Sequence, residues 1–411
     1  MHHVTGLCSL QMYPPGNCSA AEPLCLMAGE KPLVISRIRD PDAFSYDEFF
    51  RRFLVANAPC LFSAEFSRSW RSRRSWVTSD NKPNWTHLLE VYGDAIVPVA
   101  NCDVKEYNAN PKELLPLREY VAYWREYIEN GHRSPRGCLY LKDWHMRREF
   151  SGQDVYDLPV YFSSDWLNEY WDAIGKDDYR FVYMGPAGSW TPFHADVFRS
   201  YSWSANICGR KRWLLFPPGA EDLLRDPSGR LPYDVTAQSL QNHGPRPMEV
   251  IQEAGEIIFV PSGWHHQVYN LEDTISINHN WVNGCNVAAM WSLLQEELSA
   301  AQREVSEWRT TMEDWDQHCQ IILRSCCGMD YAEFYTFLQI IAEHRIHALQ
   351  GPQLMPPGPQ HLLYDLRKIT DVLLLLMDNE DFQKLDPKTL NPRPENLLSA
   401  IRRITERKEE E

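Results

Sequence analysis

The stretch Thr191-Pro192-Phe193-His194-Ala195-Asp196 decides how the chain is organised. Side chains of an extended strand alternate between its two faces, so His194 and Asp196 point to the same side. An imidazole nitrogen and a carboxylate oxygen can then reach one cation together, and His266 is the best candidate for a third ligand. Two histidines and one carboxylate on one face of a metal are typical of non-haem Fe(II) oxygenases. Taken alone the His-x-Asp pattern is weak, because a hydrogen-bonded turn or strand end also produces it.

The composition is that of a folded globular protein with an acidic surface. The chain has 411 residues, 44% of them hydrophobic, and a formal net charge of −15. This charge disfavours direct binding to nucleic acid and favours a basic protein partner. The 11 cysteines form no Cys-x-x-Cys pair, which predicts reduced thiols rather than a zinc ribbon. We find no secretory signal and no apolar run of the roughly 20 residues that span a bilayer, so we expect a soluble cytoplasmic protein that binds no membrane.

The hydrophobic pattern divides the first 285 residues into three regions. Residues 1–32 show no clear period and are predicted to be a flexible leader. Residues 33–134 mix short strands and helices, and we expect this N-terminal α/β flanking region to pack on the core. Residues 135–285 hold many short strand candidates separated by Gly, Pro and Asp, which predicts an antiparallel sandwich or barrel. The clearest strand candidates are residues 180–184, 201–208, 212–216, 248–252, 257–260, 266–270 and 274–280.

Residues 286–411 change to a helical period, with a Pro/Gly linker at residues 351–360. Two apolar stripes recur at helical spacing, one of Met290, Leu294, Leu298, Ala301 and Val305 and one of Phe334, Phe337, Leu338 and Ile341. They predict faces that pack on the outer wall of the core, with a homodimer through these helices as the alternative. The predicted fold class is therefore a mainly β core with N-terminal flanking helices and a C-terminal helical region.

The motifs around the candidate metal ligands occur in a specific order. A Gly- and Pro-containing turn at residues 185–190 delivers the chain to Thr191, and residues 206–218 resemble a strand, a tight turn and a strand that ends in Phe-Pro-Pro. Residues 255–264 then lead into His266, and residues 275–281 close the region with an alternating strand. With this order, residues 135–285 resemble the JmjC family of Fe(II)- and 2-oxoglutarate-dependent oxygenases.

This resemblance implies a double-stranded β-helix, a cupin-like jelly-roll barrel with iron inside one mouth. It assigns His194, Asp196 and His266 to Fe(II), and leaves the remaining positions to 2-oxoglutarate and O2. The cosubstrate's far carboxylate needs a buried cation, and Lys211 matches the family's lysine, with hydroxyl groups from Thr191 and Tyr140 beside it. Asn278 is a further candidate contact, a satisfied core polar group being the alternative. The family register places the metal at His266, so that His265 faces the opposite side of its strand.

The flanking segments 139–145, 161–168 and 264–268 narrow the resemblance to one kind of JmjC protein. It implies a protein hydroxylase that acts on a lysyl side chain of a peptide-chain release factor in translation termination. The first alternative is a JmjC lysine demethylase, which we disfavour because the sequence shows no reader module or zinc finger. The second is a non-catalytic cupin-type scaffold that has lost iron, which the intact ligand set and Lys211 disfavour.

Overall fold

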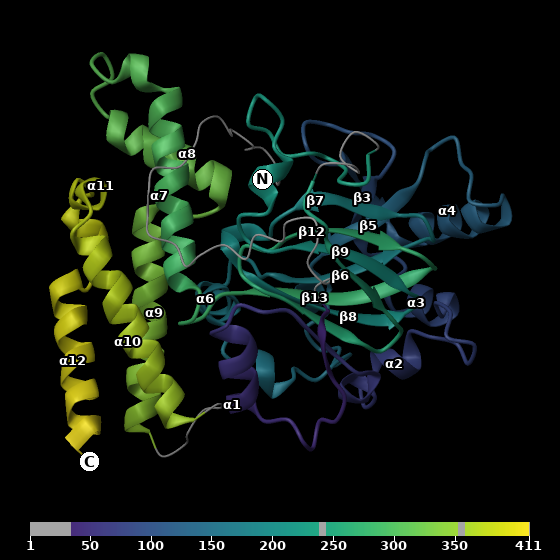
Figure 1. Cartoon of the computed structure of the whole chain (residues 1–411), viewed down its shortest axis with the longest axis horizontal. Coiled ribbons are helices and arrows are strands. Elements are labelled where there is room, and N and C mark those ends of the chain that lie inside the picture. The colour runs from purple at the N-terminus through teal and green to yellow at the C-terminus, as the bar shows by residue number, and fades with distance from the viewer. Residues whose placement is uncertain (1–33, 238–243, 352–357, 411) are drawn as a thin grey trace.

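The computed structural model describes residues 34–237, 244–351 and 358–410, and its centre consists of two β-sheets (Figure 1). The larger sheet has nine strands, in the spatial order β1 (Ser36–Ile38), β2 (Cys60–Phe62), β11 (Ile257–Val260), β8 (Tyr201–Cys208), β13 (Thr274–Trp281), β6 (Arg180–Gly185), β5 (Leu139–Trp144), β3 (Ile96–Asn101) and β4 (Lys112–Pro116). The smaller sheet has four, in the order β10 (Met248–Gln252), β9 (Lys211–Phe216), β12 (His265–Asn270) and β7 (Trp190–His194). Apart from the parallel pair β1–β2, neighbouring strands are antiparallel. The predicted mainly β core of jelly-roll type is confirmed.

Polar and apolar side chains alternate along β13 and sort to opposite faces of the large sheet. Ile275 and Ile277 join the apolar cluster on the outer face, so Ser276 and Asn278 face the smaller sheet. Helices of the N-terminal half cover that outer face, namely α1 (Tyr46–Phe49), α2 (Ser72–Ser75), α3 (Trp85–Tyr92), α4 (Leu117–Glu129) and α5 (Met146–Glu149). Tyr120 of α4 is fully buried there and donates a hydrogen bond to the Met184 carbonyl at 2.8 Å.

The space between the two sheets is apolar in one part and polar in the other. Strands of both sheets contribute to one buried apolar cluster, whose members include Leu61, Trp213, Leu215, Val250, Ile258, Val260 and Val268. Lys211 lies two residues before Trp213 on β9, and His266 and Asn270 each lie two residues from Val268 on β12. Because side chains two residues apart share one face of a strand, these three polar residues face the same side as the cluster. The polar side chains of the candidate site therefore lie in the barrel interior, beside this apolar cluster.

The N-terminal flanking region extends the large sheet, and does not only pack on it as expected. Strands β1 and β2 form one edge of this sheet, while β3 and β4 form the other, and β3 pairs with β5 across the predicted boundary at residue 135. The predicted leader, residues 1–32, lies outside the described residues. The same is true of residues 352–357 within the predicted linker.

The C-terminal helices stand together on one side of the barrel (Figure 1, green to yellow). They are α7 (Val287–Glu304), α8 (Trp315–Cys327), α9 (Tyr331–Gln350), α10 (Pro359–Met377), α11 (Glu380–Gln383) and α12 (Pro394–Glu410). Most of the first predicted stripe and all of the second pack inside one apolar cluster of this chain, so their partners there are intramolecular. None of the described helices combines the length and hydrophobicity needed to cross a membrane.

The C-terminal helices pack on α6 (Trp166–Ile174) and on the turn at Val197–Arg199, and not on the outer wall of the sheet as predicted. The Trp166 ring lies 6.3 Å from that of Phe337, and its indole nitrogen donates to Asp365 at 3.1 Å. Arg345 of α9 is 3% exposed and pairs with both Glu169 of α6 and Asp365 of α10. A buried guanidinium with two carboxylates ties the helices to α6, and removing one partner leaves an uncompensated charge.

We expect a chain that ends at residue 284 to be insoluble or to unfold without cooperativity. It exposes the apolar face of α6, where each large side chain loses about 1.5–3 kcal/mol of burial. Leu338→Asp, at a fully buried position of α9, should have the same effect in the full chain, whereas Leu375→Asp, at a site 56% exposed, should not. Soluble yield and thermal denaturation measure this. A soluble, cooperatively folding truncation would show that the helices form an independent module.

Candidate metal centre

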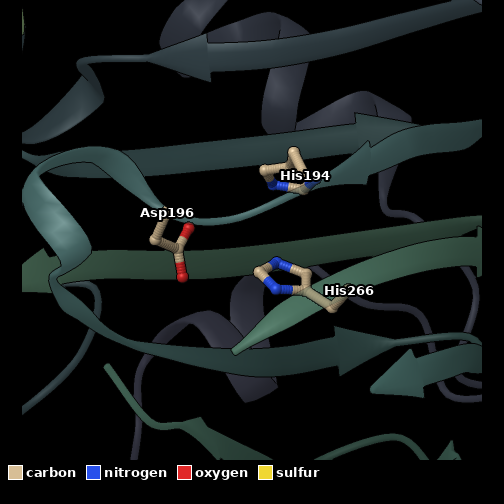
Figure 2. A group of neighbouring side chains, drawn as sticks. All are labelled: His194, Asp196 and His266. Carbon is tan, nitrogen blue, oxygen red and sulfur yellow. The ribbon is translucent and has the colours of Figure 1, made fainter. Parts of the chain in front are cut away.

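His194, Asp196 and His266 converge on one point of the barrel interior (Figure 2). His194 ends β7 and lies directly opposite His266 of β12 in the strand register. Asp196 follows two residues later, where the chain leaves the strand. The ligand atoms of the three side chains lie within 4.8 Å of one another, and the two imidazole centroids are 4.4 Å apart. This grouping of two nitrogens and one carboxylate suits a divalent transition metal.

The hydrogen bonds of the two imidazoles leave one nitrogen of each ring free for a metal. Nδ1 of His194 lies 2.8 Å from the Pro192 carbonyl, and Nδ1 of His266 lies 3.1 Å from the Trp264 carbonyl. A proton on Nδ1 that donates to these carbonyls places the lone pair on Nε2. Burial, then the neighbouring His266, lowers the pKa of His194, which keeps its ring neutral as a ligand must be. Ser202 of β8 donates to Asp196 at 2.6 Å and so fixes the carboxylate.

His265 lies on the other face of β12, as the sequence predicts. Its ring packs 5.3 Å from that of Phe193, and its Nδ1 is 3.7 Å from Glu221. Burial, then the neighbouring His266, lowers its pKa to about 4. His265 therefore belongs to the layer outside the small sheet and points away from the ligand group.

A bulge in β7 brings Thr191 onto the same interior face as His194. They are three positions apart in sequence, a spacing that puts side chains on opposite faces of a regular strand. Here His266 pairs with His194 but Val268 pairs with Thr191, so one extra residue of β7 is accommodated between the two pairs. The threonine thus faces the interior alongside Val268.

Lys211 is 2% exposed and holds together a small polar group in the interior. Its ammonium donates to the Tyr140 hydroxyl at 3.1 Å and to the Asn270 side-chain oxygen at 2.9 Å. A Cβ at Gly185 would collide with the Tyr140 ring, so glycine is needed there for this ring to lie over β6. Burial, then the nearby Lys142, lowers the pKa of Lys211 to about 7. An ammonium held by neutral groups only, with a lowered pKa, is suited to an incoming carboxylate.

Asn278 faces the interior from β13, between Ser204 of β8 and Phe181 of β6 in the register. Its amide lies 3.3 Å from the hydroxyl of Ser276, and in the described structure it makes no hydrogen bond to Lys211, Tyr140 or Asn270. The Ser204 hydroxyl is buried and has no hydrogen-bond partner among the described residues. The Ser204 hydroxyl therefore keeps its hydrogen-bonding capacity in the barrel interior.

Sequence reasoning gave no role to three polar residues of the interior, namely Ser202, Asn270 and Lys142. The spacing along a strand could have identified two of them, because residues an even number of positions apart share one face. Asn270 is four residues after His266, and Lys142 is two residues after Tyr140. Ser202 could not be assigned without knowing that β8 passes beside Asp196.

A second group of potential ligands, His145, Asp177 and Asp178, is accounted for by ion pairs within the chain. His145 and Asp178 are 2.5 Å apart, and Arg148 pairs with Asp177 at 3.2 Å. The Arg148 guanidinium already pairs with the Asp177 carboxylate that a metal cation would need, so this group has a structural role.

The first group fits iron and 2-oxoglutarate. Two imidazole nitrogens and one carboxylate oxygen lie within 4.8 Å of one another, a ligand set typical of Fe(II) sites that keep further positions for a chelating ligand. Lys211 offers a buried ammonium to a carboxylate, and the unpaired Ser204 hydroxyl offers a further hydrogen bond.

Comparisons with known proteins agree with this geometry. Residues 181–281 match the family model described as JmjC domain, hydroxylase. The chain is 62% identical to 2-oxoglutarate and iron-dependent oxygenase JMJD4 of Gallus gallus over 372 residues, which are 85% of this chain and 88% of the relative. It is 57% identical to the Homo sapiens protein of that name, over 91% of this chain and 92% of the relative. Arginine-specific demethylase JMJ20 of Arabidopsis thaliana is 41% identical, over 74% and 69% of the two chains.

These matches confirm both resemblances seen in the sequence, to the JmjC family and, within it, to jumonji domain-containing protein 4. They also confirm the predicted cofactor, Fe(II), and the cosubstrates 2-oxoglutarate and O2. The chain belongs to the JmjC family of 2-oxoglutarate- and iron-dependent oxygenases.

Proposed function

We propose that this oxygenase hydroxylates an unmodified lysyl side chain of a peptide-chain release factor, and so acts on translation termination. The close similarity to jumonji domain-containing protein 4 over most of the chain is the observation that carries this proposal. The matched family is described as a hydroxylase, which favours oxygen insertion. The formal net charge of −15 favours a basic protein as substrate over nucleic acid.

The proposal assigns each site residue a role. His194, Asp196 and His266 are the iron ligands, which is what their convergence within 4.8 Å supports. The residues proposed to contact 2-oxoglutarate are Lys211, Thr191, Tyr140 and Asn278, all of which face the interior. Lys211 supplies the charge, while the hydroxyls and the amide supply hydrogen bonds that orient the cosubstrate.

The bound iron supplies the oxidising chemistry, in which O2 and 2-oxoglutarate are converted to CO2 and succinate while one oxygen atom enters a substrate C–H bond. The chain's residues bind and orient the participants. The carbonyls of Pro192 and Trp264 hold both imidazoles in the tautomer that can bind metal, and Ser202 holds Asp196. Lys211 anchors the far carboxylate, so the opposite end of the cosubstrate is directed to the metal.

Demethylation is the second candidate, since a relative 41% identical to this chain is named an arginine-specific demethylase. Hydroxylation of an N-methyl carbon gives a product that loses formaldehyde, so demethylation needs the same iron site. Hydroxylation of the N-methyl carbon of a methyl-lysine would likewise lead to lysine demethylation. The distinction therefore rests on the substrate atom that is held near the iron.

Incubation of the enzyme with Fe(II), 2-oxoglutarate and a purified release factor should add the mass of one oxygen atom to a lysine. Tandem mass spectrometry locates the addition, and Asp196→Ala is the control, because this variant loses an iron ligand. Loss of methyl groups from methyl-arginine or methyl-lysine peptides, without oxygen gain on unmodified lysine, would replace this proposal with the demethylase. If succinate forms but neither oxygen gain on lysine nor loss of methyl groups is seen, the oxygenase assignment stands and the release factor is excluded as the substrate.

The proposed substrate implies a cytoplasmic location. The eight cysteines in the described part of the chain are free thiols, which suits a reducing compartment.

A further inference from the structure

Lys142 is a second buried ammonium of the barrel interior, and no role has been assigned to it so far. It is 9% exposed, and in the described structure no carboxylate lies within ion-pair distance of its Nζ. The adjacent Asp143 carboxylate is already paired with Lys112 and accepts a hydrogen bond from Tyr183 at 2.6 Å. Burial of a lysine without a partner is costly, so a position of this kind calls for an explanation.

Lys142 lies beside the residues of the candidate site. It follows Tyr140 by two residues on β5, so the two side chains share one face of the strand, and the Tyr140 hydroxyl accepts a hydrogen bond from Lys211. Its Nζ lies 5.8 Å from the centroid of the Tyr140 ring, and the Nζ of Lys211 lies 5.7 Å from the same centroid. Two ammonium groups therefore flank one ring in the barrel interior.

We infer that Lys142 binds a carboxylate of 2-oxoglutarate, as a second ammonium contact beside Lys211. The cosubstrate carries two negative charges, and the two ammonium groups beside the Tyr140 ring have no carboxylate partner in the described structure. Charge-assisted hydrogen bonds to a carboxylate then replace the water that each ammonium loses on burial. The inference concerns the cosubstrate alone and holds whichever protein is hydroxylated.

The Lys142→Met variant tests this, since methionine keeps an unbranched stem and removes the charge. In calorimetric titrations of the Mn(II)-loaded full chain, the dissociation constant for 2-oxoglutarate should rise roughly 10- to 100-fold. The variant without ligand should melt at a higher temperature than the wild type, because an unpaired buried charge has been removed. Its gain in melting temperature on adding 2-oxoglutarate should be smaller. Lys105→Met is the matched control, because it removes an equal charge from an exposed loop and should leave the affinity unchanged.

A purely structural role of Lys142 predicts the opposite pattern, a lower melting temperature without ligand and an unchanged affinity for 2-oxoglutarate. An affinity within twofold of the wild type would overturn the inference. Unchanged affinity together with a raised KM for the protein substrate would assign Lys142 to that substrate instead. A crystal structure of the wild-type chain with Mn(II) and 2-oxoglutarate is an independent measurement that needs no folded variant. It should show the Nζ of Lys142 in hydrogen-bond contact with a carboxylate oxygen of the ligand, and contact with protein atoms only would refute the inference.

Discussion

Replacing His266 by alanine should abolish both metal binding and 2-oxoglutarate turnover. The side chain supplies one of three ligand atoms that lie within 4.8 Å of one another. Loss of a partner that only orients a ligand already costs about 10- to 100-fold in metal affinity, so loss of the ligand itself should exceed about 100-fold. Titration with Mn(II), followed by its paramagnetic resonance signal, measures the affinity, and succinate release measures turnover. His194→Ala and Asp196→Ala should behave in the same way.

His265→Ala is the matched control for this experiment, because it removes the same imidazole from the adjacent position. Its ring packs against Phe193 on the other face of β12, away from the ligand group. The variant should therefore keep nearly all of its metal affinity, whatever it loses in stability. Retained metal binding in His266→Ala together with its loss in His265→Ala would show that the strand register is wrong.

The sequence was most informative where one face of a strand is buried and the other carries the site. Alternation along β13 separates Ile275 and Ile277 from Ser276 and Asn278, and this period-two pattern survives in the structure. The same rule places His194 and Asp196 on one side before any contact is known. For these residues the local pattern and the tertiary environment agree, so the pattern alone is enough.

Thr191 shows where the simple rule fails. Its spacing from His194 predicts opposite faces in a regular strand, and only the family resemblance made it a candidate for the cosubstrate. The bulge that brings both to the interior depends on the pairing of β7 with β12, about 75 residues later in the chain. The register between β7 and β12 depends on a strand that is distant in sequence, so the residues around Thr191 alone cannot predict it.

The partner of the C-terminal helices was also beyond the sequence. The stripe that includes Phe337 and Leu338 predicts a buried face, which is observed, but not the surface that buries it. Phe337 packs on Trp166 of α6, and Phe334 of the same stripe stacks on Trp291 of α7. The Arg345 ion pairs add a polar contact to α6 and α10. Helical periodicity indicates how much area is buried, whereas the choice of partner depends on the three-dimensional arrangement of the barrel.

The second large effect is expected at Lys211. In the Lys211→Met variant, the far carboxylate of 2-oxoglutarate enters a buried site without its counter-charge. Breaking a buried ion pair in this way costs about 3–5 kcal/mol, which corresponds to a rise in KM of about 100- to 5,000-fold. Metal affinity should stay near the wild-type value, because Lys211 contacts Tyr140 and Asn270 and not the metal ligands. An unchanged KM would remove Lys211 from the site.

The same residue should make 2-oxoglutarate binding depend on pH. Burial, then Lys142, lowers the pKa of Lys211 to about 7 in the ligand-free protein, and a bound carboxylate raises it again. Below pH 7 the ammonium is already charged, so the affinity is nearly constant. As the pH rises above 7, binding must take up a proton, and the affinity falls until the raised pKa of the complex is passed. Calorimetry of the Mn(II)-loaded protein at pH 8, in two buffers with different ionisation enthalpies, counts the protons taken up. Because a methionine cannot titrate, the Lys211→Met variant should take up fewer protons than the wild type by up to one, and equal uptake in both proteins would show that Lys211 is already charged in the empty site.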